Sequence, residues 1–198
     1  TEVGQGGESA DLAIPVFVNP WVVSQDLVVQ IPADEDGVDS DENEDPDDDN
    51  VHILLGSGDG FSTMADGRVL YGFSFNDLND LLPPPVTDPD SNPDTVNHGR
   101  ATISLAKIME VGVGTLEAKF AAPTIKVRQG QQVYLNLVNV GMALRPDLFD
   151  PHTVHWHGFP NASTVFDGVP DSSISVNMAA NLTYFYNVQE EGTYMYHC

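Results

Sequence analysis

Hydrophobic and polar residues alternate along much of the second half of the chain, a pattern typical of β-strands with one buried face. The clearest example is Gln132–Val140, in which Val133, Leu135 and Leu137 share one face. Short runs of this kind, separated by turn-forming residues, predict an all-β sandwich or barrel. The predicted strands are Leu27–Ile31, Val51–Leu55, Thr102–Val111, Pro123–Arg128, Gln132–Val140, Ile174–Met178 and Thr183–Val188.

Glycines and prolines interrupt this pattern in the first half of the chain. Gly56–Gly60 predicts a turn, and Asn76–Leu82 predicts a short helix that ends before three consecutive prolines. Residues 83–99 contain five prolines together with Asp and Asn, a composition typical of a linker. We therefore expect an N-terminal extension with short strands over residues 1–99, and one β domain over residues 100–198.

Acidic residues dominate the charge of the chain. Seven Lys and Arg stand against 30 Asp and Glu, which gives a formal net charge of −23. This charge argues against nucleic acid and anionic membranes as partners. No apolar run reaches the roughly 18 residues that a membrane span requires. The 198 residues are enough for one ordinary domain and an appendage.

The charge peaks in residues 34–50, where eleven of the 17 residues are acidic. The segment opens with Asp-Glu-Asp-Gly-Val-Asp-Ser-Asp, which resembles the calcium loops of extracellular proteins, although it lacks a complete EF-hand pattern. Carboxylates close to a glycine turn can surround a hard cation with oxygen ligands. A solvated acidic loop and a salt-adapted surface are the alternatives. The candidate calcium ligands are Asp34, Asp36, Asp39 and Asp41.

Four of the six histidines and the only cysteine lie in the last third of the chain. They belong to two stretches, Pro151–Gly158 and Gly192–Cys198, which are rich in β-branched and aromatic residues and predict two strands. Side chains two residues apart share a face of a strand, and side chains an odd number apart point to opposite faces. If the two strands are neighbours, this rule predicts which histidines face the same side.

Strand parity divides the candidate metal ligands into two groups. His155, His157 and His197 converge on one face of the two strands. His152 and Cys198 converge on the other face. A thiolate with an imidazole is the beginning of a blue-copper electron-transfer site, which a second histidine and a weak axial methionine normally complete.

The group formed by His155, His157 and His197 offers different chemistry, since imidazoles alone suit copper or zinc in a more open, reactive site. A structural zinc ion, or no metal at all, is the alternative, because a lone cysteine is often a small buried hydrophobe. Trp156 and Met195 lie between the candidate ligands, and we interpret them as packing residues.

Three motifs of this region resemble the copper-binding cupredoxin domain of the multicopper oxidases. They are His-Thr-Val-His-Trp-His-Gly at 152–158, Asp-Gly-Val-Pro at 167–170 and Gly-Thr-Tyr-Met-Tyr-His-Cys at 192–198. The resemblance covers roughly residues 100–198. It implies a cupredoxin-like Greek-key β-sandwich, to which the irregular acidic N-terminal extension is added.

The resemblance also implies a role for each residue of the motifs. His152 and Cys198 would bind type 1 copper, and His155 would bind type 2 copper. The type 3 copper pair would be bound by His157 and His197, and Asp167 would lie near this trinuclear cluster and deliver protons.

By the same resemblance, the protein is expected to be a copper-dependent oxidase. It would couple the one-electron oxidation of a reducing substrate, a metal ion or a phenol, to the reduction of dioxygen to water. One cupredoxin domain supplies half of the cluster's histidines, so a second cupredoxin domain must come from the same polypeptide or from another subunit. We also expect an oligomer. The family includes exported metal-associated oxidases of bacteria, which favours an extracellular or periplasmic location.

Two other functions stay open at this stage. The first alternative is a copper electron-transfer or nitrite-reducing protein. Nitrite reductases of similar fold also contain Tyr-His-Cys, but their histidine pair is spaced differently and lacks His-x-His. A structural or filament-forming extracellular protein, stabilised by calcium and with vestigial copper sites, is the second alternative.

The family pattern continues beyond the position of Cys198. In the family another histidine follows this cysteine, and a second type 1 histidine, an axial methionine and a closing strand come next. We therefore expect the 198 residues to be the N-terminal portion of a longer polypeptide.

Overall fold

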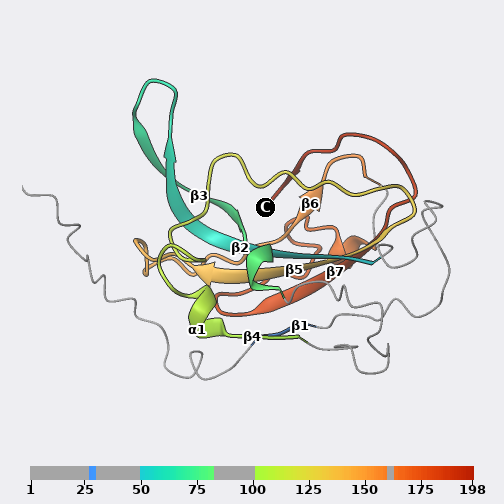
Figure 1. The fold of residues 1–198 in the computed structure, drawn as a ribbon, viewed down its shortest axis with the longest axis horizontal. Coiled ribbons are helices and arrows are strands. Elements are labelled where there is room, and N and C mark those ends of the chain that lie inside the picture. The colour runs from blue at the N-terminus through green and yellow to red at the C-terminus, as the bar shows by residue number, and fades with distance from the viewer. Residues whose placement is uncertain (1–26, 30–49, 83–100, 160–162) are drawn as a thin grey trace, which may run out of the picture.

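The computed structural model describes residues 27–29, 50–82, 101–159 and 163–198. Its centre is a four-stranded sheet in the order β3-β2-β5-β7 (Figure 1). β2 and β5 are parallel, and both outer pairs are antiparallel. The strands of this sheet are β2 (Asn50–Thr63), β3 (Val69–Asp77), β5 (Gln132–Gly141) and β7 (Asn181–Asn187).

Two short antiparallel ladders accompany the central sheet. The first joins β6 (His155–Trp156) to β8 (Tyr196–His197), and the second joins β1 (Leu27–Val29) to β4 (Ala101–Ile103). The helical elements are short: α1 covers Leu105–Ile108, and 3₁₀ turns cover Asn79–Leu81 and Thr164–Phe166.

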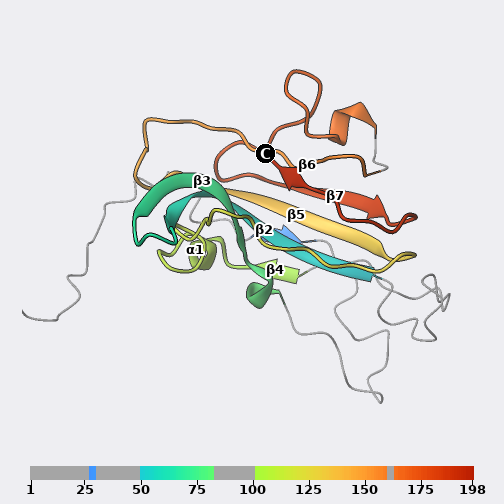
Figure 2. The ribbon, with the colours of Figure 1, turned by 90° about the horizontal axis from the view of Figure 1, so that it is seen from above.

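Apolar side chains cover both faces of the central sheet. Neighbouring residues of one strand point to opposite faces, so a continuous apolar run is needed where both faces are buried. Figure 2 shows β6 on one side of the sheet and α1 with β4 on the other. The first core includes Leu55, Val133, Leu135, Leu137, Val154, Val176, Tyr184 and Tyr186. The second core includes Leu54, Ile103, Leu105, Ile108, Val138 and Val140.

The all-β prediction is confirmed, and the predicted strand Gln132–Val140 is almost the whole of β5. The central sheet draws strands from both sides of the predicted boundary at 99/100, since β2 and β3 precede it. In the described part of the chain no helix is long and apolar enough to cross a membrane. The acidic segment 34–49 and the proline-rich residues 83–99 lie outside the described residues, as do all four candidate calcium ligands.

The predicted turn at Gly56–Gly60 is wrong, because this segment continues β2. A side chain at Gly58 would lie 2.7 Å from the carbonyl oxygen of Gly141, and one at Gly60 would overlap the backbone of Ala118. The glycines therefore permit close approach of neighbouring chain, a use of glycine within strands that local sequence does not distinguish from a turn.

Four other predicted elements differ from the structure. Thr102–Val111 is not one strand: Ser104 caps α1 by accepting a hydrogen bond from the N–H of Lys107, and the chain turns into a helix. The helix predicted over Asn76–Leu82 is reduced to one 3₁₀ turn. Pro123–Arg128 forms no strand, and one isolated bridge, at Val176, represents the strand predicted over Ile174–Met178.

A buried carboxylate connects the β2–β3 hairpin to the chain that follows β5. Asp59 is fully buried in β2. Its Oδ1 accepts a hydrogen bond from the N–H of Ala143 at 3.0 Å, and its Oδ2 accepts from the N–H of Leu144 at 2.8 Å. The hydroxyl of Tyr71 in β3 also donates to Oδ2, at 2.7 Å. One side chain therefore joins three separate segments.

Candidate metal centre

The β6–β8 ladder brings three histidines together, as strand parity predicts. His155 lies directly opposite His197 in the ladder. The ring centroid of His155 is 5.2 Å from that of His157 and 5.6 Å from that of His197. The centroids of His157 and His197 are 4.8 Å apart. Residues about 40 positions apart in the chain thus form one cluster of imidazoles.

Backbone carbonyls orient two of these three rings. Nδ1 of His155 lies 2.6 Å from the carbonyl oxygen of Asp167, and Nδ1 of His197 lies 2.6 Å from that of Cys198. A carbonyl can only accept, so both Nδ1 atoms carry a hydrogen and both Nε2 atoms keep their lone pair when the ring is neutral. Nε2 of His197 lies 2.7 Å from Nε2 of His157, so the two rings also contact each other.

Asp167 contacts the histidine cluster mainly through its backbone. Its carboxylate Oδ1 is 3.6 Å from Nδ1 of His155, whereas its carbonyl oxygen is at 2.6 Å. The next residue, Gly168, has φ +77°, and a side chain there would overlap the carbonyl of Val154. The Asp-Gly pair therefore lets this turn lie directly against the strand that carries His155.

The second predicted pair, His152 and Cys198, is also brought together. Nδ1 of His152 is 3.4 Å from Sγ of Cys198, and the N–H of Thr153 donates to the same sulfur at 3.4 Å. The His152 side chain is 5% exposed, and burial lowers its pKa below the ordinary value, which favours the neutral form that binds metals. Its buried Nε2 has no hydrogen-bond partner within the described chain.

The residues present fit a copper site by their donor atoms. A thiolate facing an imidazole suits copper, and a cluster of neutral imidazoles suits copper or zinc. Among residues 50–82, 101–159 and 163–198, no group of three or more His, Cys, Asp or Glu is arranged so that it could hold a metal ion by itself. The ligand roles of the five residues, and the calcium site at residues 34–41, remain predictions.

An aromatic cavity of about 710 Å³ borders the ladder on the face away from the three histidines. Trp156 and Tyr196 line it, and their rings are 4.8 Å apart. Trp156 packs against the core, as predicted. Burial raises the pKa of Tyr196 to about 12, so its hydroxyl stays protonated and donates to the carbonyl of Pro123 at 2.5 Å. These contacts hold the non-histidine face of the ladder in place.

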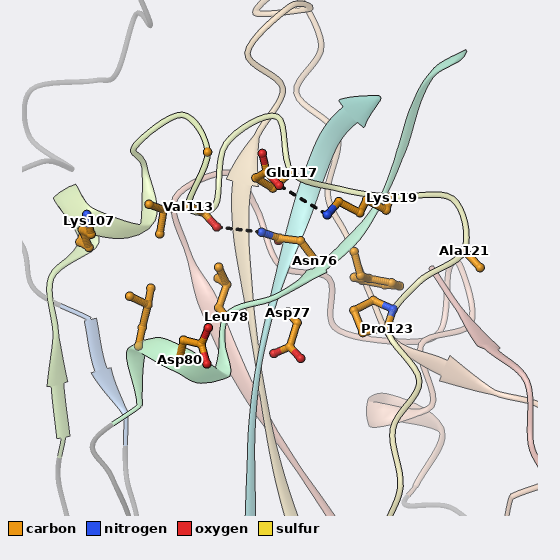
Figure 3. Close-up of a pocket in the computed structure, with 13 residues that line it drawn as sticks. Asn76, Asp77, Leu78, Asp80, Lys107, Val113, Glu117, Lys119, Ala121 and Pro123 are labelled. Carbon is orange, nitrogen blue, oxygen red and sulfur yellow. Dashed lines mark hydrogen bonds and ion pairs between the residues drawn. The ribbon is translucent and has the colours of Figure 1, made fainter. Parts of the chain in front are cut away.

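A second cavity, of about 480 Å³, lies beside β3 (Figure 3). Two interactions cross its wall: Asn76 Nδ2 donates to the carbonyl of Val113 at 3.1 Å, and Lys119 pairs with Glu117 at 3.7 Å. Neither Asp167 nor any of the five candidate copper ligands lines this cavity. It is therefore separate from the candidate metal centre.

Asn139 is a residue near the site that the sequence-based prediction missed. It is fully buried in β5, and its side chain donates to the carbonyl of Asp150, two residues before His152, and to that of Val176, the bridge partner of His152. A signal was present, because an asparagine inside the apolar run Leu135–Val140 must find partners when it is buried. The sequence pattern does not reveal which partners it finds.

The chain is similar to proteins that are described as multicopper oxidases. A family model described as multicopper oxidase matches residues 97–198. No curated protein matches the chain. Solved structures with a similar fold include a multicopper oxidase from Pseudomonas thermotolerans, with 17% identity and a TM-score of 0.44 over 75% of this chain and 24% of that one.

Two further solved structures are similar to the same degree. One, described as a multicopper oxidase, has 20% identity and a TM-score of 0.43 over 75% of this chain and 35% of its own. The other, described as a multicopper oxidase from Campylobacter jejuni and a metallo-oxidase, has 16% identity and a TM-score of 0.42 over 85% of this chain and 24% of its own. The chain spans well under half the length of these proteins.

Proposed function

Because the chain belongs to the multicopper oxidase family, we propose that it contributes an all-β, cupredoxin-like domain to a copper-dependent oxidase. The oxidase would couple the one-electron oxidation of a reducing substrate to the reduction of dioxygen to water. The observation that supports the proposal is the grouping of the five candidate ligands into two sets at and beside the β6–β8 ladder. His152 lies against Cys198, and the three other histidines form a cluster with one another.

Each group of residues has a distinct role in this proposal. His152 and Cys198 would hold type 1 copper, His155 would hold type 2 copper, and His157 and His197 would hold the type 3 pair. Copper, when bound, supplies one-electron redox chemistry. Cys198 and His197 are adjacent, so a short covalent path joins the two groups of ligands.

The substrates and partners of the domain are part of the proposal. Dioxygen would be the oxidant, and a metal ion or a phenol would be the reductant. The remaining histidines of the cluster would come from a second cupredoxin domain, in the same polypeptide or in another subunit of an oligomer. An extracellular or periplasmic location, which exported bacterial members of the family support, completes this proposal.

Oxygen consumption tests the proposed function. Copper-loaded protein that also contains the second cupredoxin domain is expected to consume dioxygen when a phenol is added, and the same protein treated with a copper chelator is expected to consume none. A thiolate–copper absorption band without any oxygen uptake would instead favour an electron-transfer protein. Absence of both signals would contradict the proposal and favour a structural protein.

Asp167→Asn is expected to slow oxygen reduction by about 10²-fold or more, while the reduction of the thiolate-bound copper keeps its rate. The carbonyl of Asp167 orients His155, and this substitution preserves the carbonyl. The amide that replaces the carboxyl group can hydrogen-bond but cannot relay a proton, and proton transfer of this kind contributes about 10²–10⁴-fold. Stopped-flow absorbance of reduction and reoxidation separates the two steps. Unchanged reoxidation of the variant would refute the proton-transfer role.

A further inference from the structure

We propose that Asn139 is a positioning residue that fixes His152 in the orientation facing Cys198. The inference rests on the proposed function for its purpose, since it concerns how the chain prepares a thiolate–imidazole pair for a metal ion. Its geometry stands independently of that function. The hydrogen bonds that the Asn139 side chain donates go to the backbone around His152, through which it acts.

The side chain of Asn139 binds three separate backbone groups. Its Nδ2 donates to the carbonyl of Asp150 at 2.9 Å and to the carbonyl of Val176 at 2.8 Å. Its Oδ1 accepts from the N–H of Gly141 at 2.9 Å, which turns the chain at the end of β5. Both hydrogens of the amide are therefore used, and an asparagine is the short side chain that offers two donors and one acceptor here.

The two carbonyls that Asn139 binds determine the backbone position of His152. Val176 is the partner of His152 in an isolated bridge: the N–H of His152 donates to the carbonyl of Val176 at 3.0 Å, and the N–H of Val176 donates to the carbonyl of His152 at 2.8 Å. Asp150 lies two residues before His152. One amide group thus holds both chain segments on which the histidine depends.

The ring of His152 depends on this backbone support because its own hydrogen bonds are few. Its Nε2 is buried without a partner among the described residues, and its Nδ1 faces the sulfur of Cys198 at 3.4 Å. The contact with sulfur is too weak a hydrogen bond to hold the ring by itself. The direction of Nδ1 is therefore set by packing and by the backbone that Asn139 holds.

Asn139→Asp changes this support with almost no change in shape. The substitution removes both donors and places a carboxylate oxygen close to the carbonyl oxygens of Asp150 and Val176. These oxygens repel each other, so the backbone around His152 loses its support. Asn136→Asp is the matched control. Asn136 lies in the same strand and is 1% exposed, but its Nδ2 donates to side chains of β7, to Asn181 at 3.2 Å and Thr183 at 2.8 Å.

Two measurements on both variants test the proposal. In metal-free protein, hydrogen exchange at the amides of His152 and Val176 is expected to accelerate in Asn139→Asp and not in Asn136→Asp. In a titration with Co²⁺, which binds thiolate and imidazole without oxidising the thiol, Asn139→Asp is expected to bind about 10–100-fold more weakly, as loss of an outer-shell partner does. Its thiolate–cobalt absorption band should also shift, whereas Asn136→Asp should retain the native band.

Equal effects of the two variants on exchange at His152 and on the cobalt band would overturn the inference. If the unsubstituted protein shows no thiolate–cobalt band, the copper role in the proposed function fails, and the exchange measurement alone still decides the role of Asn139. Should Asn139→Asp not fold, Asn139→Ser and Asn136→Ser are compared in the same two measurements. Serine is too short to bind both carbonyls at once.

Discussion

Cys198→Ser is expected to abolish the thiolate–copper absorption band and to reduce substrate-driven oxygen uptake by more than about 10²-fold. Loss of an outer-shell partner costs 10–100-fold, so loss of the thiolate itself should cost more. The serine hydroxyl is a poor copper ligand, although it nearly matches the thiol in shape. Visible absorption of the copper-loaded variant and an oxygen electrode measure the two effects.

Met195→Leu is the control for this substitution, because it removes the other sulfur of residues 192–198. Met195 is 61% exposed, and we assign it no role in metal binding. The control is expected to retain both the absorption band and the oxygen uptake. If Cys198→Ser retained the band, the sulfur ligand would have to be another residue, and the proposed type 1 site would be wrong.

Asp59→Ala is expected to lower the free energy of unfolding by about 3–5 kcal/mol, the largest stability effect that we predict. The substitution removes the acceptor of three donors: the N–H groups of Ala143 and Leu144 and the hydroxyl of Tyr71. These hydrogen bonds are partly buried around the fully buried Asp59, and each donor left without its acceptor costs up to about 1–3 kcal/mol. Urea denaturation followed by circular dichroism measures the change.

Asp66→Ala provides the comparison for this stability prediction. Asp66 lies in the turn of the same hairpin and pairs with Arg68 at 2.7 Å, but its side chain is 52% exposed. Removing an exposed ion pair should change the free energy of unfolding by less than about 1 kcal/mol. Equal destabilisation by the two alanine variants would show that the hydrogen bonds of Asp59 do not hold the hairpin.

The arrangement of the candidate ligands could be predicted because it depends on a rule with period two. His155 and His157 must share a face if the segment is a strand, and His197 and Cys198 must point to opposite faces. The structure brings the three histidines into one cluster and His152 against Cys198, although β6 and β8 contain only two residues each. The orienting contact from the carbonyl of Asp167 could not be foreseen, since every residue has a carbonyl and only the fold selects one.

Errors in the predicted elements arose where local structure is decided by contacts that the pattern of polar and apolar positions does not record. Gly58 and Gly60 were expected to form a turn, yet they lie within β2 because other parts of the chain approach their backbone closely. Thr102–Val111 has enough apolar residues for a strand, but the cap at Ser104 starts a helix after three residues. Neither contact is visible in a local pattern of polar and apolar positions.

Anomalous X-ray diffraction from copper-loaded crystals tests the central claim most directly. Data collected on both sides of the copper absorption edge locate copper atoms independently of any assumed ligand. We predict one copper within bonding distance of His152 Nδ1 and Cys198 Sγ, and further copper at the cluster of His155, His157 and His197. Copper peaks at neither of these positions in fully loaded protein would contradict the proposed metal centre.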